Sequence, residues 1–148
     1  MWFFDLLHDG HIDILRLAKQ HCDYLIVAVG TDDFMIKRKH RTSVLSYEQR
    51  VKIVEAIKYV DMVVPEIDLN KIDAYELYHF NVMFSGEDHI NEPAYVESTR
   101  ILKEKGVETI YFPRKNNVSS TQIRKRIVKL NPLSVEKQNY KCTQDLKF

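Results

Sequence analysis

Short apolar runs alternate with amphipathic segments along the chain. Residues 23–29 form a nearly continuous apolar run rich in β-branched residues, which predicts a strand buried on both faces. Three more short strands are predicted, at residues 62–65, 81–85 and 109–112. The predicted helices comprise one that ends near residue 20, one that begins at 46, two over 73–80 and 91–105, and one that begins at 119 or 120. This alternation predicts an α/β fold, a Rossmann-like parallel sheet with helices on both faces.

Capping residues mark several of the predicted helix ends. Ser46 stands three residues before Gln49, which is a capping-box pattern, and Gly106 is expected to end the helix over 91–105. Leu77 is expected to face inward. Ser119 or Ser120 is predicted to cap the last helix, which is amphipathic. Its apolar positions are Ile123, Ile127 and Leu130, and its basic positions, expected to be solvated, are Arg124, Lys125, Arg126 and Lys129.

Composition and length predict one folded domain over residues 1–130, followed by a polar tail over 131–148. The net charge of +1 argues against electrostatic capture of nucleic acid. No apolar run approaches the ~20 residues of a membrane span, and the first residues lack the features of a signal peptide. Cys22 and Cys142 lie far apart and form no metal-ligand pattern. A reducing, cytoplasmic location is therefore expected.

Candidate chemistry begins at His8-Asp9-Gly10-His11. The spacing of His8 and His11 places both imidazoles on one side of the first turn of a helix. That turn also carries free N–H groups and the positive end of the helix dipole, so it can bind phosphate. Gly10 leaves room for a ligand to approach the backbone. The alternative is that two such histidines are polar surface residues without a chemical role.

A second candidate is the basic stretch that includes Lys37, Arg38 and Lys39, expected to be a loop. It leaves the carboxyl end of a strand, where open α/β sheets bind ligands, although a solvated surface is an equal alternative. Residues 86–88 and Arg114 leave the same edge. Basic and histidine side chains that converge there favour a polyphosphate ligand.

Three motifs together carry a family resemblance. His8-Asp9-Gly10-His11, residues 46–50 (Ser-Tyr-Glu-Gln-Arg) and residues 119–123 (Ser-Ser-Thr-Gln-Ile) occur in this order. The chain resembles nucleotidyltransferases of the cytidylyltransferase-like superfamily from residue 4 to about residue 127. Within it, the stretches at 4–8, 59–61 and 113–123 resemble the glycerol-3-phosphate cytidylyltransferases. The histidine motif alone is shared with adenylyltransferases.

The resemblance implies transfer of CMP from CTP, with Mg²⁺, to a phosphorylated alcohol, with release of pyrophosphate. It implies the following catalytic residues: His8, His11, Lys37 or Arg38 or Lys39, and Arg114. The residues implied to bind the nucleotide are Gly10, Asp88, Arg114, Ser119, Ser120, Thr121 and the position of Phe3. Those implied to bind the acceptor are Arg50 and Lys58. It also implies a homodimer and a role in cell-envelope polymer synthesis.

Each implied role has a plainer alternative. Arg50 can pair with a neighbouring carboxylate, and Lys58 can be an ordinary surface residue. Ser119 and Ser120 can serve only as a helix cap, and Asp88 can be a turn residue. At Lys58 the family usually has arginine, so a bidentate contact there would be weakened.

The chain departs from the family pattern at its beginning. The family has an apolar strand that leads into a Gly-Thr-Phe-Asp turn, and here Trp2 and Phe3 stand at the glycine and threonine positions. The first strand of the sheet is therefore expected to be absent, which leaves unpaired backbone edges. We expect a truncated relative with impaired catalysis. The alternative is that another segment or a partner chain fills the gap.

These observations leave three hypotheses open. The first is a cytidylyltransferase that acts on glycerol 3-phosphate. The second is an adenylyltransferase that acts on another phosphorylated acceptor, and the third is a non-catalytic relative that binds nucleotide or a partner. A nucleic-acid-binding module is least favoured because no motif of that kind is present.

Overall fold

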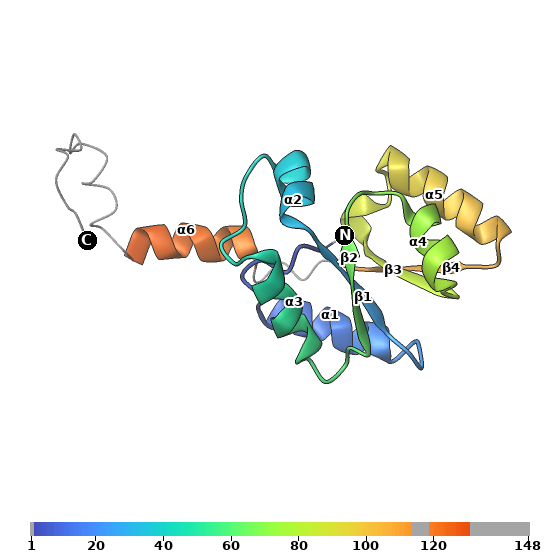
Figure 1. The fold of residues 1–148 in the computed structure, drawn as a ribbon, viewed down its shortest axis with the longest axis horizontal. Coiled ribbons are helices and arrows are strands. Elements are labelled where there is room, and N and C mark those ends of the chain that lie inside the picture. Colours follow the sequence, from blue (N-terminus) through green and yellow to red (C-terminus); the bar gives the residue numbers. More distant parts are fainter. Residues whose placement is uncertain (1, 114–118, 131–148) are drawn as a thin grey trace.

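Helices and strands alternate along the computed structural model, which describes residues 2–113 and 119–130 (Figure 1). The helices are α1 (Asp9–Lys19), α2 (Asp32–Lys39), α3 (Tyr47–Glu55), α4 (Lys71–Tyr78), the short 3-10 helix η1 (Glu87–His89), α5 (Pro93–Glu104) and α6 (Ser120–Leu130). The strands are β1 (Ile26–Gly30), β2 (Met62–Glu66), β3 (Val82–Gly86) and β4 (Glu108–Phe112). The predicted α/β fold with parallel strands is confirmed.

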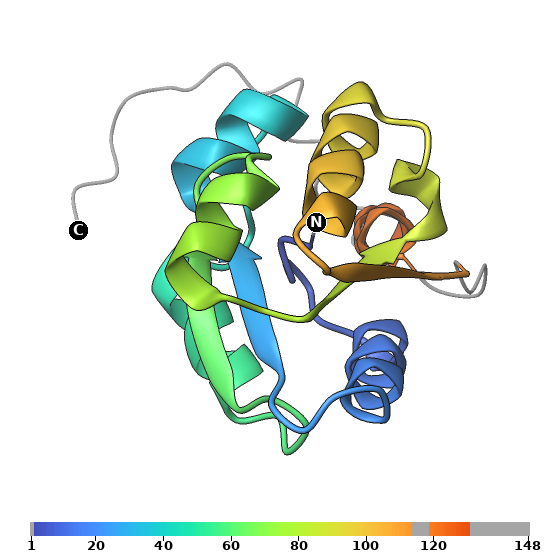
Figure 2. The same cartoon turned by 90° about the vertical axis from the view of Figure 1, so that its right-hand side faces the viewer.

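The strands form two separate parallel pairs in the described residues. β1 pairs with β2, with Ile26 opposite Met62, and β3 pairs with β4, with Val82 opposite Glu108. Figure 2 shows the two pairs apart, with the N-terminal segment between them. No strand precedes α1 in the described chain, and Trp2 makes a single parallel bridge to Val29. The sheet that the sequence predicts as one is therefore divided.

The largest apolar cluster joins the two pairs on the side of α1. Its buried members are Phe4, Leu15, Ala18, Leu25, Val27, Val29, Val54 and Phe112. α1 supplies Leu15 and Ala18, which are three residues apart and share one helical face. A smaller cluster around Met83 and Leu102 holds α5 against β3 and β4.

The capping residues of α3 are correctly predicted. Ser46 Oγ accepts the N–H of Gln49, and Gln49 Oε1 accepts the N–H of Ser46 at 2.9 Å, which completes a capping box. Gly106 follows the end of α5 with a φ of 83°, a backbone conformation that favours glycine.

The predicted basic loop is wrong, because Lys37, Arg38 and Lys39 form the last turn of α2. Thr31 starts this helix by accepting the N–H of Phe34 at 3.2 Å. The three cations then stand at the helix C-terminus, where the macrodipole favours positive charge.

One prediction of a buried apolar position is also wrong. Leu77 is 72% exposed, because Ile72 and Tyr75 turn the opposite face of α4 toward the cluster around Met83. On α6, Ile127 is 53% and Leu130 is 73% exposed. In the described part of the chain, no helix is both long and apolar enough to cross a bilayer.

Candidate active site

The two histidines lie side by side at the start of α1. His8 is the N-cap residue and His11 belongs to the first turn, and their ring centroids are 4.0 Å apart. The N–H of Gly10 donates to His8 Nδ1 at 3.2 Å, and the N–H of His8 donates to His11 Nδ1 at 3.3 Å. The imidazoles therefore cap the N-terminus of α1 by accepting backbone N–H groups, as serine or aspartate side chains do in other helices.

These contacts determine which ring nitrogen carries the proton. A nitrogen that accepts a hydrogen bond is unprotonated, so each neutral ring has its proton on Nε2. Burial lowers the pKa of His8. Burial, together with the charge of His8, lowers the pKa of His11 from 6.5 to about 4. Both rings are therefore neutral at pH 7, and each presents an Nε2–H donor rather than a positive charge.

Gly10 makes room for the His8 ring. A Cβ atom at Gly10 would lie 2.9 Å from His8 Cε1, closer than real Cβ atoms come, and 3.0 Å from His8 Nδ1. The sequence suggests that the glycine admits a ligand to the backbone. In the structure the group that it admits is the capping imidazole.

Asp5 is a buried carboxylate that holds three segments together. Its Oδ1 accepts the N–H groups of Val44 and Leu45 at 2.9 and 3.3 Å, and its Oδ2 contacts the guanidinium of Arg124. Its carbonyl accepts the hydroxyl of Ser120 at 2.7 Å. The prediction that Arg124 is only solvated is therefore wrong, because its ion pair with Asp5 attaches α6 to the N-terminal segment.

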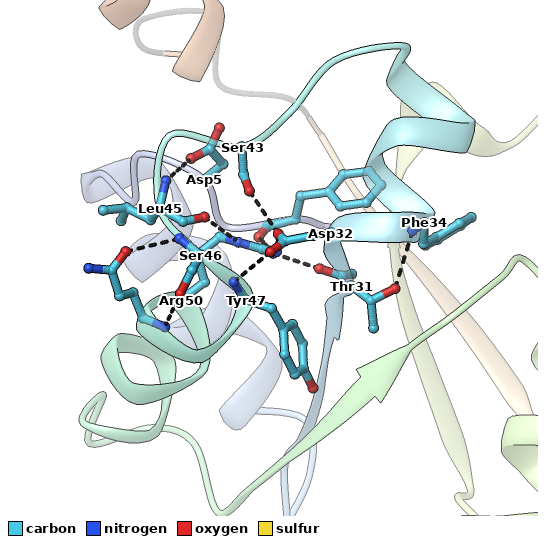
Figure 3. Close-up of polar contacts among 12 residues, drawn as sticks. Asp5, Thr31, Asp32, Phe34, Ser43, Leu45, Ser46, Tyr47 and Arg50 are labelled. Carbon is cyan, nitrogen blue, oxygen red and sulfur yellow. Dashed lines mark hydrogen bonds and ion pairs between the residues drawn. The ribbon is translucent and has the colours of Figure 1, made fainter.

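Arg50 is fully buried and its guanidinium is almost fully engaged (Figure 3). Nη1 donates to the carbonyls of Phe3 at 2.7 Å and Gly30 at 2.6 Å, and Nε donates to the carbonyl of Leu45 at 3.2 Å. Nη2 donates to Asp32 at 2.5 Å. These contacts use four of the five N–H donors of an arginine. The plainer alternative for Arg50, pairing with a neighbouring carboxylate, is what the structure contains.

Phe3 lies over the end of β1. A Cβ atom at Gly30 would fall 2.3 Å from the Phe3 ring, and the ring packs against Phe34 with centroids 5.5 Å apart. Phe3 is buried in a small cluster with Phe34 and Met35. At the position where the family resemblance implies a threonine hydroxyl, this chain therefore places an apolar core residue.

The three cations of α2 differ in their surroundings. Arg38 forms a two-pronged contact with Glu92, with both N···O distances at 2.9 Å, and Glu92 also contacts His89 Nδ1 at 3.0 Å. This contact links α2 to the turn before α5. Lys37 and Lys39 are exposed. They are thus the cations of α2 that can reach a ligand without breaking an ion pair such as that of Arg38 with Glu92.

The remaining predicted residues are spread along the chain. Asp88 lies in η1, beside the end of β3, and Thr121 is exposed in the first turn of α6. Ser119 Oγ accepts the N–H of Gln122 at 3.2 Å, so Ser119 rather than Ser120 is the cap. Arg114 lies outside the described residues.

Lys58 lies at the opposite end of α1 from the histidines. α1 follows its N-cap His8 and ends at Lys19, whose Nζ contacts the Asp61 carboxylate at 2.5 Å just before β2 begins. Lys58 is exposed and lies over the ring of Tyr59. Eleven residues of helix span about 16 Å, so the structure does not bring Lys58 to His8 and His11.

The main residues that sequence reasoning missed are Asp5 and Asp32, whose carboxylates organise the backbone around Arg50. Asp32 also accepts the Ser43 hydroxyl at 2.8 Å and the N–H of Tyr47 at 3.1 Å. A signal was present for Asp5, a lone charge in an apolar stretch that is rarely buried unless it is paired. For Asp32 no such signal exists, because acidic residues are common in the first turn of any helix.

The described residues thus form a parallel α/β fold whose first helix begins with two imidazole donors. The family model described as cytidylyltransferase-like matches residues 3–126, and the chain belongs to this family of enzymes.

Curated relatives extend over most of the chain. It is 41% identical over 125 residues to the glycerol-3-phosphate cytidylyltransferase of Staphylococcus aureus, covering 84% of this chain and 89% of the relative. It is 39% identical over 129 residues to the enzyme of the same name from Bacillus subtilis, covering 86% and 93%. A 61-residue stretch is 48% identical to an FAD synthase of Pyrococcus abyssi and covers 41% of each chain.

One solved structure is similar in fold. The lipopolysaccharide core biosynthesis protein of Thermoplasma volcanium superposes with a TM-score of 0.62 at 20% identity, covering 80% of this chain and 93% of that one. At this identity the likeness concerns the arrangement of helices and strands only.

Proposed function

We propose that this enzyme transfers CMP from CTP to glycerol 3-phosphate and releases pyrophosphate. The observation that carries the proposal is the similarity, at about 40% identity, to glycerol-3-phosphate cytidylyltransferases along nearly the whole chain. The paired histidines at the start of α1 supply a site whose chemistry suits this reaction.

The reaction needs no nucleophile from the protein. An oxygen of the acceptor phosphate forms a bond to the α-phosphorus of CTP, while the bond from that phosphorus to the bridging oxygen breaks and its electrons leave with pyrophosphate. The enzyme's task is to align the two substrates and stabilise the charge that develops on the triphosphate. In this proposal His8 and His11 donate Nε2–H hydrogen bonds to phosphate oxygens, and Lys37 or Lys39 adds positive charge.

We further propose that Mg²⁺ arrives with CTP, where it would neutralise phosphate charge. Among the described residues no group of three or more His, Cys, Asp or Glu side chains is placed to hold a metal ion. The triphosphate would therefore supply most of the ligands, which is the usual manner of Mg²⁺ binding to nucleotides.

The test is pyrophosphate release by the purified chain with Mg²⁺, glycerol 3-phosphate and either CTP or ATP. The proposal expects release that depends on CTP and on the acceptor. It also expects loss of release in His11→Ala, while His40→Asn, at an exposed histidine outside α1, keeps it. Equal turnover with ATP would overturn the choice of nucleotide.

A non-catalytic relative remains the second candidate, favoured by the Phe3 ring over Gly30. It predicts that the folded chain binds CTP, measured by calorimetry, but releases no pyrophosphate. Release that depends on CTP and the acceptor would reject it.

The proposal also includes a homodimer in the cytoplasm and a part in making cell-envelope polymers. The exposed apolar side chains of α6, Ile127, Val128 and Leu130, offer a surface for self-association. Light scattering of the purified chain tests the dimer.

A further inference from the structure

One ion pair crosses the gap between the two strand pairs at the carboxyl ends of their strands. Arg38 lies in the last turn of α2, the helix that follows β1, and Glu92 lies between η1, which follows β3, and α5. Arg38 Nη2 is 2.9 Å from both carboxylate oxygens of Glu92. Figure 2 shows α2 and α5 on opposite sides of the gap, at the same end of the molecule. The contact therefore connects one half of the fold to the other.

The Glu92 carboxylate is held from its own side by a buried ring. His89 Nδ1 lies 3.0 Å from Glu92 Oε1, and because a carboxylate only accepts hydrogen bonds, Nδ1 is the donor. The His89 ring stacks on the ring of Tyr95 in α5, with centroids 4.9 Å apart and planes inclined by 11°. His89 and Tyr95 are both buried. The carboxylate that receives Arg38 is thus fixed to a well-packed part of the molecule.

The two halves of α2 are held in different ways. Phe34 and Met35 are buried and pack with Phe3 in a small apolar cluster, which fixes the first half. Residues 36–40 are all exposed, so this buried packing does not extend to the second half. The ion pair of Arg38 attaches that half to the start of α5.

Lys37 and Lys39 stand on either side of Arg38 in the same turn. Successive residues of an α-helix are rotated by about 100°, so a fixed direction for Arg38 fixes the directions in which the two lysines leave the helix. Both lysines are exposed, on a helix that begins at the carboxyl edge of the strands, where α/β folds bind ligands. The position of the last turn of α2 therefore determines which points their ammonium groups can reach.

The strength of the ion pair suits positioning better than stabilisation of the whole protein. The side chains of Arg38 and Glu92 are 36% and 28% exposed, and pairs exposed to this extent contribute little to the free energy of unfolding. A contribution of that size can still change the population of one helical turn several-fold.

We propose that Glu92 is a positioning residue of the transferase. Supported by His89, Glu92 holds Arg38, and this contact places the last turn of α2 where Lys37 or Lys39 reaches the triphosphate. Glu92 itself touches neither substrate. The ligand is that of the proposed function, on which this inference rests, whereas the attachment of α2 is tested without any ligand.

The first measurement is amide hydrogen exchange of the ligand-free chain by NMR, with and without Glu92→Gln. Glutamine keeps the length of the side chain and removes its charge, and the Glu92 side chain makes no capping bond to α5 that could be lost. Exchange at residues 37–40 should become about two- to fivefold faster, while the amide of Met35 is unaffected. The matched control is Glu97→Gln, which removes a pair with Arg100 on the same helix and should leave residues 37–40 unchanged.

The second measurement is the affinity for CTP with Mg²⁺, by calorimetry, together with pyrophosphate release. Glu92→Gln should weaken CTP binding and lower kcat/KM for CTP about tenfold, while KM for glycerol 3-phosphate and Tm stay unchanged. A purely structural role would not separate the two substrates in this way. Arg38→Met should have the same effect, and the double variant should be no worse than either single variant. Glu97→Gln should behave like the unsubstituted chain.

Unchanged exchange at residues 37–40 in Glu92→Gln would overturn the proposal, and so would an unchanged affinity for CTP. Additive losses in the double variant, with Arg38→Met the worse single variant, would mean that Arg38 itself leaves Glu92 for phosphate and would also overturn it. A chain that binds CTP but releases no pyrophosphate would refute the proposed transfer, while exchange and CTP affinity would still decide the role of Glu92. A chain that binds no CTP would overturn both.

Discussion

Asp32 accepts a 2.5 Å hydrogen bond from the Arg50 guanidinium, and this contact joins the first turn of α2 to the first half of α3. The same guanidinium bonds to the Phe3 and Gly30 carbonyls. One buried side chain thus fixes the N-terminal segment, the end of β1 and both helices relative to one another.

Replacing Arg50 should therefore lower the free energy of unfolding. Arg50→Met removes the donors and leaves buried carbonyls unpaired, and we expect a loss of about 3–5 kcal/mol in the free energy of unfolding. Urea denaturation measures it. Arg100→Met is the control: Arg100 pairs with Glu97 and Glu104 on the surface, and its loss should cost at most about 1 kcal/mol.

Arg50→Lys distinguishes a structural role from acceptor binding. A lysine keeps the charge but cannot make the forked contacts, so the structural role predicts a destabilised protein. If Arg50 instead binds the acceptor, stability should be retained while KM for glycerol 3-phosphate rises. That second result would restore the role that the family resemblance implies.

His11 should make stability depend on pH. Its pKa is about 4 in the folded protein, below the ordinary 6.5, because of burial and the neighbouring His8. The unfolded chain therefore binds the proton first, and stability is complete above pH 6.5 and falls as the pH drops from 6.5 toward 4. We expect the unfolding free energy to be about 2 kcal/mol lower at pH 5 than at pH 7.5 from this residue.

The variant His11→Gln isolates this effect. Glutamine at this position can still accept the N–H of His8, as in a capping box, but does not titrate. The difference in urea stability between pH 7.5 and pH 5 should shrink in the variant. An unchanged difference would show that His11 is not the group that titrates.

The fold class could be predicted from the sequence because its signals are local. Apolar runs, the Ser46–Gln49 cap and the glycine after α5 each depend on a few neighbouring residues. The division into two strand pairs follows from the expected missing strand, but the way in which Trp2 and Phe3 occupy the space does not. That outcome depends on contacts between residues far apart, such as Phe3 with Arg50 and Phe34.

The arrangement of the two histidines in the candidate site was predictable from the sequence, whereas the positions of Arg50 and Lys58 were not. The spacing of His8 and His11 placed both rings on one turn, and in the structure they lie there with their planes tilted by 41°. The burial of Arg50 could not be read from the sequence, since a helical arginine followed by Val51 looks the same whether it faces solvent or the core. Lys58 illustrates the converse, because a motif position alone does not say whether a residue lies near the histidines or at the far end of α1.

Leu77 and Leu102 provide a test of the packing of α4 and α5. Leu102 is fully buried and Leu77 is largely exposed, although both stand at apolar positions of predicted helices. Leu102→Ala should cost about 2–5 kcal/mol, because it leaves a cavity beside Met83 and Val107. Leu77→Ala should change the unfolding free energy by less than about 0.5 kcal/mol. Comparable losses in the two variants would contradict the observed orientation of α4.

Gly10→Ala should separate the capping geometry from helix stability. Alanine favours the helix over glycine by about 1 kcal/mol, which offsets part of the cost of displacing the His8 ring. We therefore expect nearly unchanged stability toward urea.

The activity of Gly10→Ala should nevertheless change. The new Cβ would lie 2.9 Å from the His8 ring, so the ring must move and its Nε2–H donor with it. A displacement of about 1 Å can cost a hundredfold in rate, so pyrophosphate release should fall sharply. Full activity with a shifted His8 resonance in NMR would show that the position of this donor is not limiting.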